Sequence, residues 1–376
     1  MLNILIAPDS FKGTLAALPA AQAIADGIQQ VLPQACLQIF PMADGGEGTL
    51  DAILYALPGE RRNARVADVL GTPICADYAV LNAAPDSIAV LEAAQVVGLN
   101  QAGQSDVTLR STFGLGELLR HCLDQGLRRF MIGLGGSSTN DGGAGLLAAL
   151  GVKFYAASGA VIAPNPQGLA ALHHMAWDAL DPRLAQCNIT LLTDVDNPLY
   201  GAEGATAIFG PQKGVRADDV PLIDARLQGL AQLGDAWAGR ALSLEPGAGA
   251  AGGLGYALLL CGAQRRAGAE AVCELMHLDA ALAQADWVIT GEGKSDAQTL
   301  HGKLPWVVAQ HAQRAHVPVI LLSGIIENAS RAALEQAFTA CYSLVGEEVS
   351  QAQAMQETAS CLRMRAQQIA QMLLES

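Results

Sequence analysis

Short apolar runs alternate along this chain with polar segments that contain glycine. Five runs have the length and composition of buried strands, and each leads directly into a polar cluster. The runs cover residues 2–7, 129–134, 189–193, 287–290 and 317–322. Open α/β sheets bind their ligands beyond the carboxyl ends of the strands. We therefore predict that the polar clusters lie on one rim of the sheets and converge on one cleft.

Stretches with helical periodicity lie between these runs. Pro19 suits the first turn of a helix, and apolar residues from Ala20 to Val31 form one face before Pro33. Residues 114–122 and 144–150 read as short helices after glycine turns, and residues 352–374 read as one long helix. This alternation predicts parallel sheets with crossover helices. Residues 242–255, dominated by Gly and Ala, are expected to be a linker, hinge or ligand-cradling loop.

Composition and charge narrow the class of protein. A length of 376 residues favours two domains. The net charge of −14 and the absence of a basic run argue against a nucleic-acid or anionic-membrane partner. The eight cysteines are dispersed, with no Cys-x-x-Cys pair, which is typical of buried thiols in a reducing compartment. With no signal peptide and no stretch of membrane-spanning length, we expect a cytoplasmic protein without a membrane partner.

The placement of lysine points to phosphate. The chain has only five lysines among its 22 basic residues, and four of them lie in glycine-rich turns. These four are Lys12, Lys213, Lys294 and Lys303, whereas Lys153 lies outside such a turn. An ammonium group beside exposed backbone N–H groups is suited to binding phosphate. The alternative is that loops are simply rich in Gly and Lys, but that would also place lysines on helices.

The longest glycine-rich turn, residues 133–145, leads into a helix. Small residues and hydroxyls at a helix N-terminus can surround an anion, and close strand–helix packing is the lesser alternative.

Two other segments match known nucleotide-binding motifs only in part, and we reject both matches. The Gly-x-Gly-x-x-Gly pattern at 247–252 follows Pro246 rather than a strand. Val288 stands where a P-loop ending at Ser295 would need its first glycine.

Carboxylates recur in these same turns. Asp44 and Glu47 share one loop, Asp141 follows the longest glycine turn, and Asp194 with Asp196 and Glu292 with Asp296 follow two strands. A Mg²⁺ site needs only one or two carboxylates, completed by water and substrate phosphates. Any single one of these residues is better explained as a turn or N-cap residue. The whole set, beside lysines and glycines, favours an enzyme that binds a metal ion and phosphate.

Two other kinds of site are disfavoured. The seven histidines are not spaced as a group of metal ligands, and the chain has no Gly-x-Ser-x-Gly motif with the partners of a serine hydrolase.

Taken together, these motifs resemble those of a known enzyme family. The chain resembles the type I glycerate kinases over essentially its whole length. The resemblance rests on residues 7–13, 42–49, 135–145, 194–199, 209–214 and 249–255, and on Thr290-Gly291-Glu292-Gly293 with Asp296, Gln298-Thr299 and Gly302-Lys303. The chain departs from the family at Ser295, where a bulky apolar residue is usual.

The resemblance implies a two-domain α/β fold with the active site in the cleft between the domains. One domain is flavodoxin-like with a parallel sheet and is built from residues 1–65 and 265–376. The other is an inserted α/β domain of residues 66–264. The implied activity is ATP-dependent phosphorylation of D-glycerate, with 2-phosphoglycerate favoured over 3-phosphoglycerate, in organic acid, glyoxylate or aldarate catabolism. Mg²⁺ is the implied cofactor, ATP the co-substrate, and glycerate and ATP the partners.

Roles for individual residues are hypotheses carried over from the motifs. Asp194 is the expected catalytic base and Asp296 the second choice, with Lys12 as a further catalytic residue. The expected substrate-binding residues are Asp9, Ser10, Lys12, Asp44, Gly45, Gly46, Glu47 and Thr299. The expected nucleotide- and phosphate-binding residues are Gly135, Gly136, Ser137, Ser138, Asn140, Lys213, Gly214 and Lys303. The expected metal ligands are Asp44, Asp141, Asp194 and Asp296.

Two other functions fit the residues less well. A phosphosugar isomerase or aldolase would need a Schiff-base lysine in an apolar pocket, and only Lys153 lies in even a mildly apolar stretch. A non-catalytic two-domain receptor for an organic acid would normally be exported, and this chain begins with no signal sequence.

Overall fold

The computed structural model describes residues 1–82 and 86–375. The described chain divides into two compact units. The first unit comprises residues 1–44, 51–57 and the chain from 269 on, and the second comprises residues 45–50 and 58–268. Each unit is described by itself below. The domain boundaries expected near residues 65 and 265 stay a prediction.

A five-stranded parallel sheet forms the centre of the first unit. Its order is β2 (Cys36–Ile39), β1 (Asn3–Ile6), β11 (Trp287–Thr290), β13 (Val319–Ser323) and β15 (Ala340–Ser343). Numbered within the sheet this is the order 2-1-3-4-5, which is that of the flavodoxin-like fold. The predicted α/β class, with one flavodoxin-like parallel sheet, is therefore confirmed. A further two-stranded parallel ladder joins β12 (Lys294–Ser295) and β14 (Ile325–Ile326).

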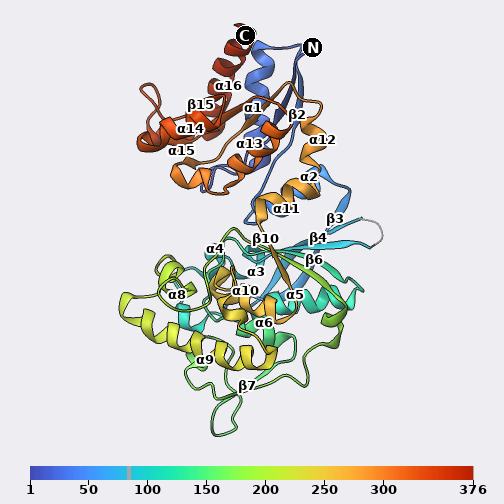
Figure 1. The fold of residues 1–376 in the computed structure, drawn as a ribbon, viewed down its shortest axis with the longest axis vertical. Coiled ribbons are helices and arrows are strands. Elements are labelled where there is room, and N and C mark those ends of the chain that lie inside the picture. The colour runs from blue at the N-terminus through green and yellow to red at the C-terminus, as the bar shows by residue number, and fades with distance from the viewer. Residues whose placement is uncertain (83–85, 376) are drawn as a thin grey trace. The chain divides into compact units, whose positions relative to one another are not determined.

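Helices cover both faces of this sheet. On one face α1 (Ala17–Val31) and α16 (Thr358–Glu375) pack side by side over Ile4, Ile6 and Ile320, as Figure 1 shows. Glycine allows this close approach, because a Cβ on Gly27 would lie 2.3 Å from the Arg363 carbonyl oxygen. Helix α13 (Leu304–Arg314) packs against β11 and β13. The remaining helices are α2 (Thr49–Ala56), α11 (Gly268–Leu275), α12 (Leu278–Leu282), α14 (Arg331–Ala337) and α15 (Gln351–Gln356).

The C-terminal region corrects one prediction. Residues 352–374 were expected to form one helix, but α15 ends at Gln356 and α16 begins at Thr358. Glu357 between them has φ −122° and ψ 35°, which is not helical. The hydroxyl of Thr358 donates to the Ala354 carbonyl over 2.7 Å. The break is therefore a local hydrogen-bonded turn that hydrophobic periodicity does not reveal.

The second unit contains a six-stranded mixed sheet. Its order is β10 (Gln264–Arg266), β9 (Asn188–Leu192), β6 (Arg129–Gly133), β5 (Ile88–Glu92), β4 (Pro73–Leu81) and β3 (Gly59–Ala67). The first four strands are parallel, and β3 and β4 add an antiparallel hairpin. The expectation of parallel strands thus holds for this part of the sheet but not for the hairpin.

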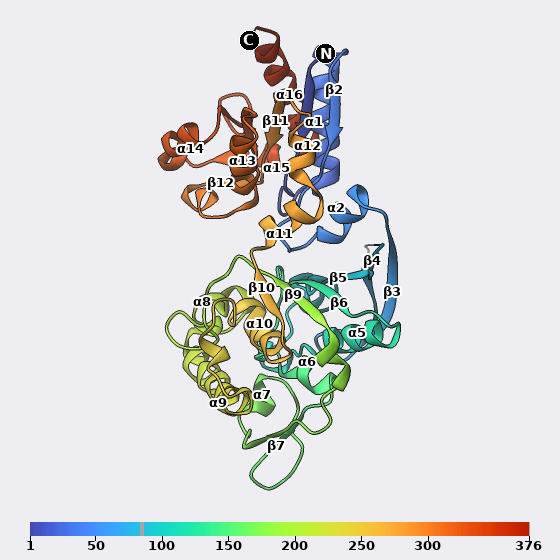
Figure 2. The ribbon, with the colours of Figure 1, turned by 45° about the vertical axis from the view of Figure 1, so that its right-hand side comes forward.

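Apolar helices pack beside this sheet to form the larger core (Figure 2). Helices α5 (Phe113–Asp124) and α6 (Ala144–Ala149) approach closely, because a Cβ on Gly116 would lie 2.6 Å from the Ala149 Cβ. Of the stretch expected to be a loop, 242–255, residues 242–249 form a 3₁₀ turn and a loop, whereas 250–255 begin the helix α10 (Ala250–Leu260), with left-handed backbone at 251–253. The other helices are α3 (Ala94–Val97), α4 (Leu99–Ala102), α7 (Pro166–Leu169), α8 (Ala205–Phe209) and α9 (Val220–Ala238), and β7 (Lys153–Tyr155) pairs with β8 (His174–Ala176).

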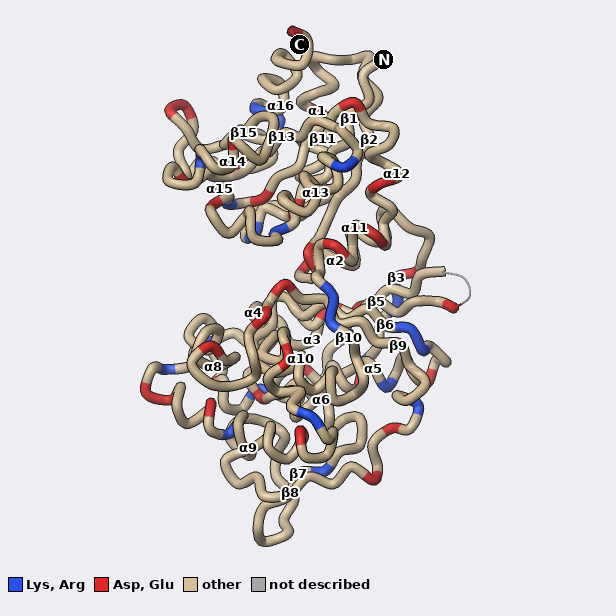
Figure 3. The backbone as a smooth tube through the Cα atoms, in the orientation of Figure 1, with Lys and Arg blue, Asp and Glu red and all other residues tan. Residues whose placement is uncertain are grey.

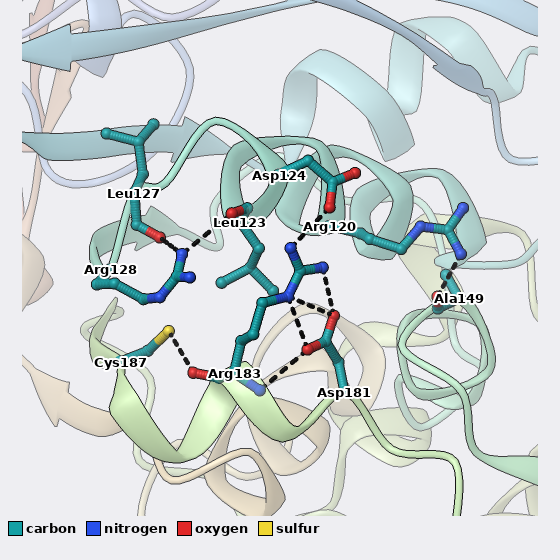
Figure 4. A network of polar contacts seen from close by, with 9 residues as sticks. All are labelled: Arg120, Leu123, Asp124, Leu127, Arg128, Ala149, Asp181, Arg183 and Cys187. Atoms are coloured by element: carbon teal, nitrogen blue, oxygen red, sulfur yellow. Dashed lines mark hydrogen bonds and ion pairs between the residues drawn. The ribbon is translucent and has the colours of Figure 1, made fainter.

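A polar network at the surface of the second unit joins α5 to the short 3₁₀ turn Pro182–Gln186 (Figure 4). The guanidinium of Arg183 donates to both carboxylate oxygens of Asp181 and, over 2.7 Å, to Asp124. Its neighbours Arg120 and Arg128 donate to backbone carbonyls. These contacts are partly exposed, and such pairs contribute little to stability. We therefore interpret this network as a contact between two surface segments, with no role in catalysis.

Charge is distributed over both units without a single dominant block. Figure 3 shows Lys and Arg positions scattered among Asp and Glu positions in each unit. Within residues 1–82 and 86–375, no helix is both long and apolar enough to cross a membrane.

Candidate active site

Polar residues gather in the first unit where β1 and β11 end. These strands are adjacent and parallel, so the segments that follow them emerge at the same edge. The backbone N–H of Asp9 donates to the Gly291 carbonyl over 2.9 Å, which ties the two segments together. The Lys12 ammonium lies 3.2 Å from the Asp44 carboxylate. Three predicted substrate-binding residues, Asp9, Lys12 and Asp44, are thus brought into one group.

Asp9 is the most perturbed carboxyl of this group. Its side chain is buried, and burial together with the negative charge of Asp44 raises the pKa of Asp9 to about 8. Lys12 and the Ser10 N–H, which donates to Asp9 over 2.6 Å, oppose this shift. The Asp44 carboxylate in turn raises the pKa of Lys12. At neutral pH Asp9 is therefore mainly protonated, and a strongly shifted carboxyl at a strand end is typical of a functional site.

Glu292 forms the centre of an adjoining hydrogen-bonded group. Its Oε1 accepts hydrogen bonds from the hydroxyls of Thr299, over 2.7 Å, and Ser295, over 2.9 Å. The Lys303 ammonium lies 3.7 Å from Oε2 of Glu292 and 3.3 Å from Oδ1 of Asp296. Burial raises the pKa of Glu292. The expected site residues Thr299, Lys303 and Asp296 thus meet around a carboxylate to which the sequence motif gave no role.

Asp296 combines capping with ion pairing. It caps the 3₁₀ turn Ala297–Leu300 by accepting the N–H of Gln298 over 3.0 Å. Its partial burial opposes ionisation, but Lys303 and the Gln298 N–H outweigh this and lower the pKa of Asp296. Lys294 lies 3.6 Å from the other Asp296 oxygen. The ionised carboxylate is therefore fixed in position beside two lysines.

In the second unit, the long glycine-rich turn after β6 packs against the backbone of Gly45 and Gly46. A Cβ on Gly133 would lie 2.1 Å from the Gly45 carbonyl oxygen, and one on Gly135 would lie 2.6 Å from the Gly46 Cα. Gly136 has positive φ. Close backbone packing, the lesser explanation from the sequence, therefore accounts for these glycines. It also places the predicted substrate-binding Gly45 and Gly46 beside the predicted phosphate-binding Gly135.

Lys213 is buried against this turn. Only 4% of the residue is exposed, and its ammonium donates to the Thr139 carbonyl over 2.8 Å and to the Ser137 hydroxyl over 3.3 Å. Burial lowers the pKa of Lys213 to about 7. The left-handed Gly214, with φ 93°, ends the short 3₁₀ turn that carries the lysine. The structure thus joins Lys213 to two members of the turn predicted to bind phosphate.

Arg110 is a second buried cation next to Lys213. Its guanidinium donates to the Lys213 carbonyl over 2.9 Å and to the Ser138 carbonyl over 3.1 Å. The Ser138 hydroxyl is itself buried and donates to the Val97 carbonyl. Burial lowers the pKa of Arg110. Arg110 therefore fixes the lysine turn to the glycine-rich turn, and no sequence motif had identified it.

Asp141 and Asn140 are packed inside the second unit. The Asp141 carboxylate accepts hydrogen bonds from the Thr112 N–H and hydroxyl, both over 2.8 Å, and from the N–H groups of Gly143 and Gly145. Burial raises the pKa of Asp141. Asn140 donates to the Thr206 hydroxyl over 2.9 Å. This geometry favours a structural role for Asp141 rather than the metal-binding role that its motif suggested.

Asp194, the expected base, follows β9 and has an exposed side chain. The Gly268 N–H donates to its Oδ1 over 2.9 Å, which orients the carboxylate. Asp196 pairs with Arg265. Glu47, in the loop after Gly46, is exposed. Asp194 is thus accessible and oriented, as a base would need to be.

The four expected metal ligands divide between the units: Asp44 and Asp296 belong to the first, Asp141 and Asp194 to the second. The described residues contain no group of three or more His, Cys, Asp or Glu side chains that could hold a metal ion. Mg²⁺ commonly takes one or two carboxylates and completes its shell with water and substrate phosphates. The exposed or partly exposed carboxylates of Asp44, Asp194 and Asp296 suit that chemistry.

Comparisons with known proteins agree with this picture. The model of the glycerate kinase family matches residues 4–374. A glycerate kinase from Halalkalibacterium halodurans is 40% identical over 373 residues, covering 98% of both chains. A glycerate 2-kinase from Escherichia coli is 39% identical over 328 residues, covering 86% of this chain and 85% of that protein. A crystal structure described as a proposed glycerate kinase 2 from Salmonella typhimurium LT2 has a TM-score of 0.85 and 40% identity, covering 100% of this chain and 98% of that one.

The fold and the polar strand ends thus define an α/β enzyme of the phosphotransferase class, with an alcohol group as the acceptor. The chain belongs to the glycerate kinase family.

Proposed function

We propose that this enzyme transfers the terminal phosphoryl group of ATP to O2 of D-glycerate, giving 2-phosphoglycerate and ADP. The observation that carries the proposal is the family match across residues 4–374. The choice of O2 is supported by the Escherichia coli relative, whose description is glycerate 2-kinase. We place the reaction in the cytoplasm and in organic acid catabolism, by way of glyoxylate or aldarates.

The first unit supplies groups suited to the hydroxy acid. The ammonium of Lys12 and the hydroxyl of Ser10 are proposed to bind the glycerate carboxylate. Asp9, protonated at neutral pH because of its raised pKa, can donate a hydrogen bond to the same group. Glu292, with Thr299 hydrogen-bonded to it, can accept from a substrate hydroxyl. Each interaction orients the acid so that one hydroxyl is presented for reaction.

Phosphate recognition is assigned to lysines and to the backbone of the glycine turn. Lys303 and Lys213 are proposed to neutralise phosphate oxygens, and the N–H groups around Gly135 to Ser138 can donate to them. Mg²⁺, held by Asp296, Asp44 or Asp194, would neutralise further phosphate charge when bound. These roles require positioning and charge neutralisation rather than covalent chemistry, as phosphoryl transfer does.

Proton removal is assigned to Asp194. Its carboxylate is exposed and is oriented by the Gly268 N–H, so it is accessible to the proton of the attacking hydroxyl. Asp296 is the second choice, since its lowered pKa keeps it ionised. The Asp194→Asn variant should lose kcat by orders of magnitude while ATP and glycerate still bind. A near-wild-type kcat would remove Asp194 as the base.

The deciding experiment is phosphorus NMR of the protein with Mg-ATP, with and without D-glycerate. We expect ADP and a new phosphomonoester only when glycerate is present. An ester at O2 splits into a doublet through its single coupled proton, whereas an ester at O3 gives a triplet. L-glycerate is the stereochemical control. Unchanged ATP with D-glycerate would contradict the proposed substrate, and a triplet would contradict the proposed hydroxyl.

A further inference from the structure

Glu92 is a buried carboxylate of the second unit that lies outside the motifs of the family resemblance. It is the last residue of β5 and is only 1% exposed. Its Oε1 accepts the backbone N–H of Leu50 over 2.6 Å, and its Oε2 accepts from the Gln95 amide over 3.1 Å. A glutamate is almost never buried this completely unless its charge is compensated by such bonds. The groups that donate to Glu92 therefore indicate its role.

The bond to Leu50 holds one end of a loop in the same unit. Residues 45–50, here called the substrate loop, include Gly45, Gly46 and Glu47, which the motifs assign to substrate binding. Leu50 is the second residue of α2, and the first four N–H groups of a helix have no partner within it. The buried Thr49 donates its hydroxyl to the Gly46 carbonyl over 2.8 Å. Glu92 and Thr49 therefore fix the C-terminal end of the substrate loop.

The other end of the substrate loop lies against neighbouring strands. Strands β5, β6 and β9 are consecutive and parallel, so their carboxyl ends share one edge of the sheet (Figure 2). A Cβ on Gly133, at the end of β6, would lie 2.1 Å from the Gly45 carbonyl oxygen. A Cβ on Gly45 would lie 2.9 Å from the Cβ of Leu192, at the end of β9. Leu192 precedes the proposed base Asp194 by two residues. The substrate loop is thus held beside the strand that leads to Asp194.

We infer that Glu92 is a positioning residue for the acceptor substrate, because it fixes the substrate loop in the conformation that receives the hydroxy acid. The inference rests on the proposed function, since it concerns the acceptor of that reaction. At 1% exposure, Glu92 acts through Leu50 rather than by touching the substrate. A loop that is already ordered loses less conformational entropy when the ligand binds. Removing the bond to Leu50 should therefore weaken binding of glycerate and leave that of ATP unchanged.

Steady-state kinetics of two variants at Glu92 test this role. Glu92→Leu removes the acceptor but keeps an apolar side chain of similar size at the buried position. We expect its KM for D-glycerate to rise at least about tenfold, the equivalent of about 1.4 kcal/mol, with the KM for ATP unchanged. Glu92→Gln keeps one oxygen for the Leu50 N–H and should restore most of the affinity for glycerate. A KM for glycerate as high in Glu92→Gln as in Glu92→Leu would overturn the role of this hydrogen bond.

A second variant and a control separate positioning from stability. Thr49→Val removes the hydroxyl that holds the Gly46 carbonyl, with little change in shape, and should also raise the KM for glycerate alone. It decides the question if Glu92→Leu does not fold. Asp235→Asn is the control, because this carboxylate of the same unit accepts instead from Ser243 and Tyr256. It should lower the urea midpoint and leave both KM values unchanged.

Hydrogen exchange without glycerate tests the loop independently of catalysis. We expect residues 44–52 to exchange faster in Glu92→Leu than in the wild type, while helix α5 keeps its protection. An unchanged KM for glycerate in Glu92→Leu and Thr49→Val, or an equal rise in both KM values, would overturn the inference. If the wild type phosphorylates no glycerate, the proposed function fails, and the exchange of residues 44–52 alone decides whether Glu92 holds the loop. Exchange no faster than in the wild type would overturn that as well.

Discussion

Replacing Lys213 with methionine tests the buried charge directly. The folded protein disfavours the ammonium, because burial lowers the pKa of Lys213 from 10.5 to about 7. Each change of one in pKa is worth about 1.36 kcal/mol. The charged form therefore costs the ligand-free fold at most about 5 kcal/mol. Methionine removes this cost but leaves the Thr139 carbonyl without its hydrogen bond, which costs about 1–3 kcal/mol.

The pH dependence separates the two effects. The unfolded lysine binds its proton up to pH 10.5, and the folded lysine only up to about pH 7. Between these values the unfolded state binds more protons, so the stability of the wild type rises with pH. The penalty is complete below pH 7 and disappears as the pH approaches 10.5. Relative to Lys213→Met, the wild type should therefore gain about 3 kcal/mol between pH 6 and pH 9.

Urea unfolding of both proteins at pH 6 and pH 9 measures this difference. Tryptophan fluorescence is a suitable signal, because Trp177 and Trp237 stack within the second unit at 4.0 Å between ring centres. Lys153→Met is the control, since Lys153 is exposed in β7. A free-energy difference between wild type and Lys213→Met that is the same at both pH values would refute the argument that burial penalises this charge.

Four further outcomes follow from the geometry. Lys12→Met should raise the KM for glycerate far more than the KM for ATP in steady-state assays, and an equal rise in both would remove Lys12 from acid binding. Asp9→Asn should gain stability relative to the wild type between pH 4 and pH 9 in thermal melts, because the pKa of Asp9 is raised to about 8 and ionising it in the fold is unfavourable. Gly252→Ala should lower the urea midpoint by the equivalent of about 3 kcal/mol or more, since its Cβ would lie 2.0 Å from the Thr139 carbonyl oxygen at φ +69°. Arg183→Gln should leave both the urea midpoint and kcat nearly unchanged, because its ion pairs lie at the surface, and a clear fall in either would show a larger role for this network.

The strand ends were the most predictable part of the site. Buried parallel strands are continuous apolar runs, so β1, β6, β9, β11 and β13 stand out in the sequence together with the polar residues that follow them. The hairpin of β3 and β4 lacks this signal. Along β3 most positions are exposed, including Glu60, Arg61 and Arg62. Backbone pairing with β4 along its whole length makes it a strand, and its position at the edge of the sheet leaves its polar side chains exposed.

Burial of charge was the least predictable part. Gly-Pro-Gln-Lys-Gly at residues 210–214 has the composition of an exposed turn, and nothing local marks its lysine as buried. Lys213 is covered because Arg110 and residues 137–139 contact it, and these lie 103 and about 75 positions away in the chain. Burial also raises the pKa values of Asp9 and Glu292, and for Asp9 the negative charge of Asp44 adds to the shift. A sequence motif can therefore identify a functional residue without showing whether its side chain is buried or protonated.

Ser295 shows how structure explains a departure from a family pattern. Type I glycerate kinases usually have a bulky apolar residue at this position, and here the serine is fully buried. Its hydroxyl lies 2.7 Å from the Ser323 hydroxyl and donates to Glu292 over 2.9 Å. Ser323 ends β13 of the five-stranded sheet, whereas Ser295 ends β12 of the two-stranded ladder, so the polar partner comes from a different sheet. Because the Ser295 proton is donated to Glu292, the Ser323 hydroxyl donates to Ser295, and Glu292 accepts from Ser295 as well as from Thr299. Because two such hydrogen bonds hold the carboxylate, the serine at position 295 helps to fix the orientation of Glu292.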